Sequence, residues 1–286
     1  MLFKILFVKQ KVLNKVEVIK MNYLEKNRNT WNAKTDIHIK SDFYSNDSFL
    51  KGRNSLNDIE LKILGDIKNL SILHLQCHFG QDTISLARLG ANATGVDFSE
   101  KSIDNAKNFA RQTNTKAKFI CSGIYELPKY LDQQFDLVFT SYGTIGWLPD
   151  ISKWAEIIAR YLKPGGRFIF VDFHPVVWMF DDDFKMFKYN YFNDGPIIES
   201  CTDTYTDHDT QIQQETVSWN HSISEVINNL LHKGLEINSF DEFDYSPYDC
   251  FNETVEFEPN GYRIKHLENK IPMVYAISAT MKTNKI

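Results

Sequence analysis

Asp97 is the residue whose position most favours ligand chemistry, because it closes the apolar run Gly95-Val96-Asp97. A carboxylate at the carboxyl end of a strand can accept hydrogen bonds from both hydroxyls of an adenosine ribose. An earlier apolar run, residues 71–75, is followed by a turn and then by a helical pattern. Strand, turn, helix and strand-end acid are the parts of a nucleotide-binding unit. We therefore expect Asp97 to bind ribose rather than only to cap the next helix.

The turn after the first strand departs from the dinucleotide pattern. Aligning it on Gly80 places Gln76 and His78 where the first two glycines would stand. In a dinucleotide site the second glycine lets the backbone approach the pyrophosphate, and His78 would obstruct that approach. S-adenosylmethionine has no pyrophosphate, and its methionine tail is slimmer. The loop therefore favours S-adenosylmethionine over NAD, with Gln76 and His78 as side-chain hydrogen-bond donors to the tail.

The elements that must position these residues alternate between strand and helix patterns. This alternation predicts an α/β protein with a doubly wound parallel sheet covered on both faces. Ser99 and Asp150 are in position to cap two of the helices. The predicted strands are 71–75, 93–97, 118–121, 135–140 and 167–173, and the predicted helices are 83–89, the segment after Ser99 and the segment after Asp150.

The pattern changes after residue 173. Residues 174–216 show no helical period and are too long for an ordinary connection, so we expect a β-rich lid insertion. Within it, Tyr189 to Phe192 and Thr202 to Thr206 are predicted to be short polar strands. A last amphipathic helix is expected from Ser222, with the apolar residues Val226, Ile227, Leu230 and Leu231, followed by strands 235–240 and 273–280.

Four motifs resemble a bacterial subgroup of class I S-adenosylmethionine-dependent methyltransferases. In chain order they are residues 75–83 (LQCHFGQDT), 95–99 (GVDFS), 135–150 (FDLVFTSYGTIGWLPD) and 162–167 (LKPGGR). Their order on the expected elements makes the resemblance fairly specific, and it covers roughly residues 22–280. It implies a Rossmann-like, mostly parallel seven-stranded sheet whose last strand is antiparallel.

The resemblance also implies a cofactor site for S-adenosylmethionine, with S-adenosylhomocysteine as product. Loop 76–82 would hold the methionine part, Asp97 the ribose, and segment 121–128 the adenine, although the family often has Asp where Gly123 stands. Thr140 and Ser141 match the position beside the transferred methyl group. The implied cofactor-binding residues are Gln76, Cys77, His78, Gly80, Asp82, Asp97, Phe98, Ser99, Gly123, Ile124, Tyr125, Thr140 and Ser141.

The methyl acceptor would meet a second group of residues. Methyl transfer needs a general base only if the accepting atom is protonated. Tyr142 and His174, each placed after a predicted strand, are the catalytic candidates, and a His174 that only bonds to backbone is an equally open alternative. The residues expected to line the acceptor pocket are Trp31, His38, Tyr44 and Trp147, whose aromatic faces suit a cationic group.

These assignments give a domain organisation. Residues 1–20 are predicted to be a dispensable extension, so a chain beginning at Met21 should fold and bind cofactor equally well. Residues 21–60 would form a helical cap, 61–173 together with 217–286 the cofactor-binding core, and 174–216 the lid. The apolar stretch near the start is too short for a membrane span.

Charge and composition favour a small-molecule acceptor and a cytoplasmic enzyme. The net charge of -5 and the absence of a basic block after residue 20 disfavour nucleic acid. So does Ser141-Tyr142-Gly143-Thr144, which replaces the Asn/Asp-Pro-Pro-aromatic motif of amino-methylating nucleic-acid enzymes. No zinc or calcium pattern is present, and the acidic run 201–210 is predicted to be a solvated hairpin tip rather than a metal site. The alternatives left open are a non-catalytic methyltransferase fold, an NAD(P)-dependent oxidoreductase, and a methyltransferase acting on a macromolecule.

Overall fold

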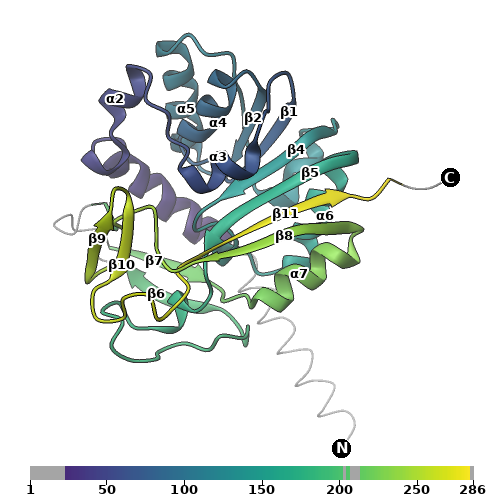
Figure 1. Cartoon of the computed structure of the whole chain (residues 1–286). Coiled ribbons are helices and arrows are strands. Elements are labelled where there is room, and N and C mark those ends of the chain that lie inside the picture. The colour runs from purple at the N-terminus through teal and green to yellow at the C-terminus, as the bar shows by residue number, and fades with distance from the viewer. Residues whose placement is uncertain (1–22, 202–203, 207–212, 284–286) are drawn as a thin grey trace, which may run out of the picture.

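The centre of the fold is a seven-stranded sheet with the strand order β3-β2-β1-β4-β5-β11-β8. The computed structural model describes residues 23–201, 204–206 and 213–283 (Figure 1). Strand β11 is antiparallel to both of its neighbours, and β1 is parallel to β2 and β4. The expected sheet is therefore confirmed. Its strands are β1 (Ser71–Leu75), β2 (Asn92–Asp97), β3 (Lys118–Cys121), β4 (Phe135–Ser141), β5 (Leu162–Phe173), β8 (Leu235–Phe243) and β11 (Val274–Met281).

The central strands are apolar in continuous runs because both faces of the sheet are covered. Successive side chains point to opposite faces, so neighbouring residues enter different clusters. Ile72 and Leu137 pack in one buried cluster, while Leu73 and Val138 pack in another on the opposite face. Two layers of helices are therefore needed to bury these strands.

The helices supply those two layers. Figure 1 shows α3, α4 and α5 on one side of the sheet and α6 and α7 on the other. As expected, Ser99 and Asp150 cap α5 and α6, each accepting a backbone N–H with its side chain. The bounds are α2 (Asn46–Leu50), α3 (Asp58–Leu64), α4 (Gln81–Arg88), α5 (Glu100–Gln112), α6 (Ile151–Tyr161) and α7 (Ile223–His232), with short 3₁₀ turns η1 (Asp42–Tyr44), η2 (Ile124–Lys129), η3 (Ile145–Trp147) and η4 (Val177–Met179).

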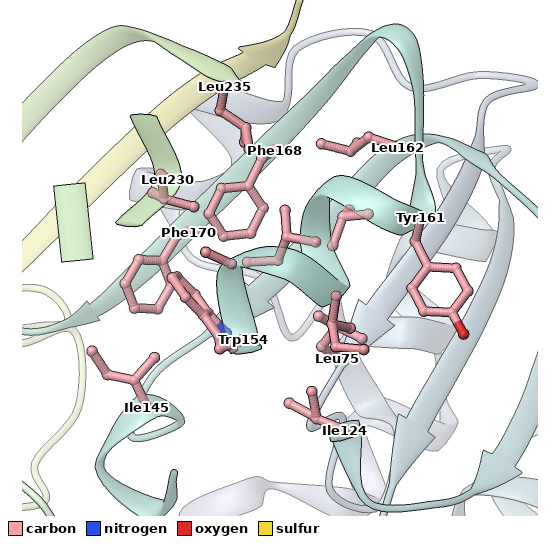
Figure 2. Close-up of a cluster of buried hydrophobic side chains, with 14 of the residues drawn as sticks. Leu75, Ile124, Ile145, Trp154, Tyr161, Leu162, Phe168, Phe170, Leu230 and Leu235 are labelled. Carbon is pink, nitrogen blue, oxygen red and sulfur yellow. The ribbon is translucent and has the colours of Figure 1, made fainter. Parts of the chain in front are cut away.

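The largest buried cluster lies between β4, β5 and the helices α6 and α7. Figure 2 shows Trp154 of α6 at its centre, beside Phe168 and Phe170 of β5. The two phenylalanine rings meet the Trp154 ring edge-on, with centroids 5.6 and 5.3 Å away. From α7, Leu230 joins this cluster, whereas Leu231 is 43% exposed.

Outside the sheet, an N-terminal helix over residues 23–38 and two hairpins gather at one end of the molecule (Figure 1). The hairpins are β6 (Ile197–Cys201) with β7 (Gln214–Ser218), and β9 (Thr254–Glu258) with β10 (Gly261–Ile264). The predicted strand at 189–192 is wrong, since that segment forms bends. Of the strand predicted at 202–206, Thr204 makes only an isolated bridge, and residues 202–203 lie outside the described residues, as do 1–20.

Candidate functional site

The loop between β1 and α4 turns sharply at residues that are not glycine. Gln76 and His78 have φ angles of 54° and 48°, the left-handed region that usually requires glycine. Gly80 follows with φ 79°, and a Cβ there would lie 2.7 Å from the Phe119 ring. Cys77, between the two strained residues, is buried under β2, where its backbone N–H donates to Val96. The loop thus keeps a tight nucleotide-loop backbone without its first two glycines.

Asp97 lies at the end of β2 and meets this loop directly. Its Oδ2 accepts from the His78 backbone N–H at 2.9 Å, and its Oδ1 accepts from the Ser99 N–H at 2.9 Å. Burial raises the pKa of Asp97 to about 6, although the backbone hydrogen bonds counteract this. A carboxylate offers about four lone-pair sites. Asp97 can therefore hold the loop and still accept from further hydroxyl groups.

Gln76 joins the same loop to the segment after β4. Its Nε2 donates to the Thr144 carbonyl at 2.8 Å, which fixes the amide orientation. Its Oε1 is buried and has no hydrogen-bond partner among the described residues. A buried acceptor left unpaired is costly, which favours a ligand that supplies a donor. The predicted donor role of Gln76 stays a prediction, since the second N–H of its amide is not bonded to Thr144, and the free Oε1 adds an acceptor that was not predicted.

A cavity of about 120 Å³ opens beside Gln76. Its walls come from the loop after β1, the segment after β3, η3 and the N-terminal helix. A Cβ added at Gly123 would meet one atom, on Leu24 at 3.9 Å, which is an ordinary van der Waals contact. The lining residues are Tyr23, Leu24, Asn27, Gln76, Phe98, Ser122, Gly123, Ile124, Tyr125, Glu126, Trp147 and Leu148. The segment predicted to receive adenine therefore lines a real cavity, together with helix residues that sequence reasoning missed.

Four predicted residues form one aromatic group around His78. The Trp31 ring meets those of His78 and Trp147 edge-on, with centroids 5.2 and 5.5 Å away. The Nδ1 of His38 lies 3.0 Å from the Nε2 of His78, so one imidazole donates to the other. Tyr44 shares a hydrogen bond between hydroxyl groups with Tyr205, which lies between β6 and β7. Burial lowers the pKa of His38 to about 2 and that of His78 to about 3, so both rings are neutral.

The segment after β4 is fixed by Asp172, which sequence reasoning missed. The Asp172 carboxylate accepts from the backbone N–H groups of Gly143, Thr144, Ile145 and Phe173, and from the Thr144 hydroxyl. An acidic residue inside the apolar run 168–173 was the signal that could have found it. Burial raises the pKa of this carboxyl group, and these hydrogen bonds offset the shift. The turn that carries Tyr142 is thus tied to β5.

The predicted residues at the end of β4 have different surroundings. Thr140 donates to the Leu75 carbonyl at 3.2 Å and is buried between strands. Ser141 donates to Asp82 at 3.4 Å, and the Tyr142 hydroxyl donates to Glu60 at 2.9 Å. Burial raises the pKa of the Tyr142 hydroxyl well above its usual range. Glu60 was also missed, although the Asn57-x-x-Glu60 spacing of a capping box was readable.

His174 lies apart from these residues. Its Nε2 pairs with Glu242 of β8 at 3.0 Å, and its Nδ1 accepts from the Val176 N–H at 3.2 Å. Both ring nitrogens are therefore engaged with residues outside the loop and the cavity. Burial lowers the pKa of His174, while Glu242 acts in the opposite direction. The hydroxyl of Ser99, another predicted residue, accepts from the Ser102 N–H, which caps α5, and donates to Asn32.

Two global properties bear on partners. Among the described residues, no group of three or more His, Cys, Asp or Glu side chains is arranged to hold a metal ion. In the same part of the chain, no helix combines the length and the apolar character needed to cross a bilayer.

Comparison with known proteins places this geometry in a family context. Residues 73–170 match the family model described as a methyltransferase domain. The ubiquinone biosynthesis O-methyltransferase of Coxiella burnetii is 31% identical over 135 residues, which are 46% of this chain and 57% of that protein. The demethylmenaquinone methyltransferase of Lactococcus lactis is 30% identical over 135 residues, 46% of this chain and 53% of that protein. The chain thus spans little more than half the length of these relatives.

Solved structures resemble the chain over more of its length. A putative S-adenosylmethionine-dependent methyltransferase from Listeria monocytogenes has a TM-score of 0.55 at 22% identity, covering 77% of this chain and 95% of its own. An S-adenosylmethionine-dependent methyltransferase from Mesorhizobium loti has a TM-score of 0.53 at 19% identity, covering 81% and 99%. At these identities the likeness concerns the fold, which agrees with the strand order described above.

Proposed function

We propose that the chain is a class I S-adenosylmethionine-dependent methyltransferase that transfers a methyl group from S-adenosylmethionine to a small molecule, since residues 73–170 match a methyltransferase domain and the fold resembles that of such enzymes. The observation that carries the proposal is the unpartnered, buried Oε1 of Gln76 beside the cavity. The amine of the methionine tail is a donor that would satisfy this atom. A pyrophosphate offers only acceptor oxygens there, so Gln76 also argues against the NAD(P) alternative.

The chain's residues fit the three parts of this cofactor. Asp97 retains acceptor capacity for ribose hydroxyls beyond its bonds to His78 and Ser99. The cavity beside Gly123 has apolar walls and a floor without a side chain, which suits a flat adenine ring. Gln76 would accept from the amine. We propose these residues as the main binding contacts, with Phe98, Ile124 and Tyr125 as packing walls.

When bound, the cofactor supplies a methyl group on a positively charged sulfur, which is a good leaving group. The protein's main task is then to hold the accepting atom in line with that methyl group, a contribution on the order of 7–11 kcal/mol for well-oriented reactants. Asp172 serves this task by fixing the turn that carries Tyr142. For proton transfer we retain Tyr142 in preference to His174, because both ring nitrogens of His174 are engaged elsewhere.

We further propose that the methyl acceptor is a small molecule rather than a nucleic acid, and that the reaction takes place in the cytoplasm. One relative compared above is named for ubiquinone biosynthesis and the other for demethylmenaquinone. Ubiquinone and demethylmenaquinone are both compounds of low molecular mass. In this chain, Trp31, His38, Tyr44 and Trp147 stand around the loop after β1 and offer an aromatic wall to such an acceptor. The net charge of -5 supports the exclusion of polyanionic acceptors.

Calorimetric titration with S-adenosylhomocysteine and with NAD tests the cofactor. We expect the wild-type protein to bind S-adenosylhomocysteine and not NAD. Asp97→Ala should weaken binding by ~1–3 kcal/mol, because the ribose hydroxyls lose their acceptor. Asp132→Asn, at an almost fully exposed carboxylate, is the matched control and should bind like wild type. Tight NAD binding would overturn the proposal, and unchanged affinity of the Asp97 variant would remove the ribose role.

A transfer assay separates an enzyme from a non-catalytic binding protein of the same fold. The protein is incubated with methyl-labelled S-adenosylmethionine and a cell extract fractionated by molecular mass. We expect the label to enter the low-mass fraction. Label in the protein or nucleic-acid fraction would contradict the small-molecule acceptor, and label in no fraction, despite cofactor binding, would favour the non-catalytic alternative.

A further inference from the structure

Glu60 is a fully buried carboxyl group that the fold alone does not require at this position. It lies in the first turn of α3, where its Oε1 accepts from the backbone and side-chain N–H groups of Asn57 at 3.3 and 3.2 Å. Its Oε2 accepts from the Tyr142 hydroxyl at 2.9 Å. A helix cap can be made by a half-exposed side chain. The full burial of Glu60, and its bond to the residue that follows β4, call for a second role.

None of the groups that most strongly shift the pKa of Glu60 is positively charged. From α4 comes the carboxyl group of Asp82, and from the segment after β4 the hydroxyl of Tyr142. Tyr245 and Tyr248, in the segment after β8, add two further phenols that feel the charge of Glu60. The positive charge of Arg53 lowers the pKa of Asp82, which burial raises. Burial, and then the neighbouring Asp82, raise the pKa of Glu60 to about 8, so the group is mostly protonated at neutral pH.

The same group of residues is tied to the proposed site of methyl transfer. Ser141, which the family resemblance places beside the methyl group, donates to Asp82. The next residue, Tyr142, has φ 37°, a strained value for a side chain of this size. Its ring meets that of Tyr248 edge-on, with centroids 5.0 Å apart. Strain that points the Tyr142 hydroxyl at a buried acid is the pattern expected where a proton must move.

We propose that Glu60 receives the proton of the methyl acceptor through the Tyr142 hydroxyl, and that the positive charge of the bound cofactor is what makes Glu60 ready to receive it. The inference rests on the proposed function. A positive charge near two carboxyl groups favours their ionised forms, so Glu60 gives up its proton to solvent when the cofactor binds. Since Glu60 acts through Tyr142, it is a positioning residue rather than one that touches the acceptor.

The proton balance of the transfer then closes. Tyr142 takes the proton of the methyl acceptor on its oxygen while its own proton passes to Glu60. The accepting atom's electron pair forms the new bond to the methyl carbon, and the sulfur keeps the pair of the bond that breaks. The positive charge is thereby removed, and Glu60 is again protonated in an environment without that charge. One proton leaves when the cofactor binds, and the acceptor supplies its replacement.

The experiment counts protons and needs no acceptor. S-adenosylmethionine and S-adenosylhomocysteine are titrated into the protein at pH 7.5 in buffers of different ionisation enthalpy. The two ligands share adenosine and the amino-acid tail and differ in the charge on sulfur, so the Glu60→Gln variant is needed to separate the proton of Glu60 from those of other groups that this charge affects. We expect S-adenosylmethionine to release up to about one proton more than S-adenosylhomocysteine. The excess should disappear at pH 9.5, where Glu60 is already ionised in the free protein.

Glu60→Gln should bind both ligands and show no excess release. Asp136→Asn is the matched control, because Asp136 lies at the other end of β4 beside Lys163, and it should keep the excess. Equal release by the two ligands in wild type, or an excess that survives in Glu60→Gln, would overturn the inference while leaving the proposed function intact. Failure to bind either ligand counts instead against the proposed function. If Glu60→Gln does not fold, an excess that persists at pH 9.5 in wild type overturns the inference.

Discussion

Gln76 and His78 hold backbone conformations that side-chain-bearing residues seldom adopt, at a cost of order 1–3 kcal/mol each. The structure shows what keeps them there. Gln76 is tied to the Thr144 carbonyl, and His78 is tied to Asp97 by its backbone and to His38 and Ser102 by its ring. Hydrogen bonds to three other segments thus hold the positive φ angles that two glycines would adopt without strain.

Gln76→Gly tests this account at the residue scale. Relief of backbone strain should roughly offset the lost bond to Thr144, each being worth about 1 kcal/mol, so the midpoint of thermal unfolding should change little. Affinity for S-adenosylhomocysteine, measured by calorimetry, should fall about tenfold because the acceptor for the amine is gone. Asn69→Gly is the control, since Asn69 also has positive φ (64°) but lies outside the cavity lining. Unchanged affinity of Gln76→Gly would contradict the assigned contact.

Sequence reasoning found the residues that a single segment can reveal. Asp97, the loop after β1 and the cavity segment at Gly123 are all readable from one strand and the turn behind it. Glu60 and Asp172 were missed because their roles depend on residues distant in the chain, namely Tyr142 and the backbone at 143–145. The free acceptor of Gln76 was missed for the same reason, because Thr144, which orients the amide, follows a different strand.

At the scale of elements, the N-terminal helix is docked on strand β7 by Lys26 and Thr30, which bond to Glu215, and by Asn27. Asn27 donates to the Val217 carbonyl at 2.7 Å and accepts from the Val217 N–H at 2.9 Å, so it pairs with β7 as another strand would. Tyr23 and Trp219 add an edge-on ring contact with centroids 5.1 Å apart. The helix that lines the cavity therefore depends on the lid for its position.

Asn27→Ala should loosen both elements together. Leaving the Val217 backbone groups unpaired costs about 1–3 kcal/mol, and the cost should appear as local opening rather than global unfolding. Hydrogen exchange should become faster in residues 23–38 and 214–218 and stay unchanged in the central strands. Asn105→Ala, which removes only a bond within α5, is the matched control. Faster exchange confined to the helix would show that the two elements are not coupled.

The core elements were predictable and the lid was not, for a physical reason. Buried parallel strands need continuous apolar runs and helices between them, so their pattern is local. Hairpins outside the sheet are set by which segments pair, and a polar, aromatic-rich stretch is compatible with several pairings. The strand predicted at 189–192 was wrong for this reason. The hairpin of β9 and β10 was missed, although Pro259-Asn260-Gly261 is a turn signal.

For the whole molecule, buried titratable groups shape the dependence of stability on pH. Burial lowers the pKa of His38 to about 2 and those of His74 and His78 to about 3. The unfolded chain takes up these protons near pH 6.5, so stability falls as the pH drops below that value. Glu60 and Asp97 have pKa values raised to about 8 and 6, so they bind protons that the unfolded chain releases. Their ionisation lowers stability as the pH rises toward those values.

We therefore expect these buried groups to place the stability maximum near neutral pH, as measured by urea unfolding. In His74→Asn the free energy of unfolding should depend less steeply on pH between pH 6.5 and 4.5. The loss of one titrating group should reduce the slope by ~1.4 kcal/mol per pH unit. Among the described residues, the His74 ring has one hydrogen-bond partner, the Thr83 hydroxyl, and His74 is not part of the cavity lining. His232→Asn, on the last turn of α7, is the control and should keep the wild-type slope. An unchanged slope for His74→Asn would contradict the neutral, buried state of this ring.

The hydrogen bonds of Asp172 have a consequence for how the specificity for the proposed acceptor can be altered. Every donor to that carboxylate except the Thr144 hydroxyl is a backbone amide, and backbone amides are retained when side chains change. Backbone donors therefore hold the course of the main chain from 143 to 145. A combinatorial library should keep Gly143, whose φ is 69°, and Ile145, which is buried in the core, and should vary Trp147, which lines the cavity at the end of this ordered segment.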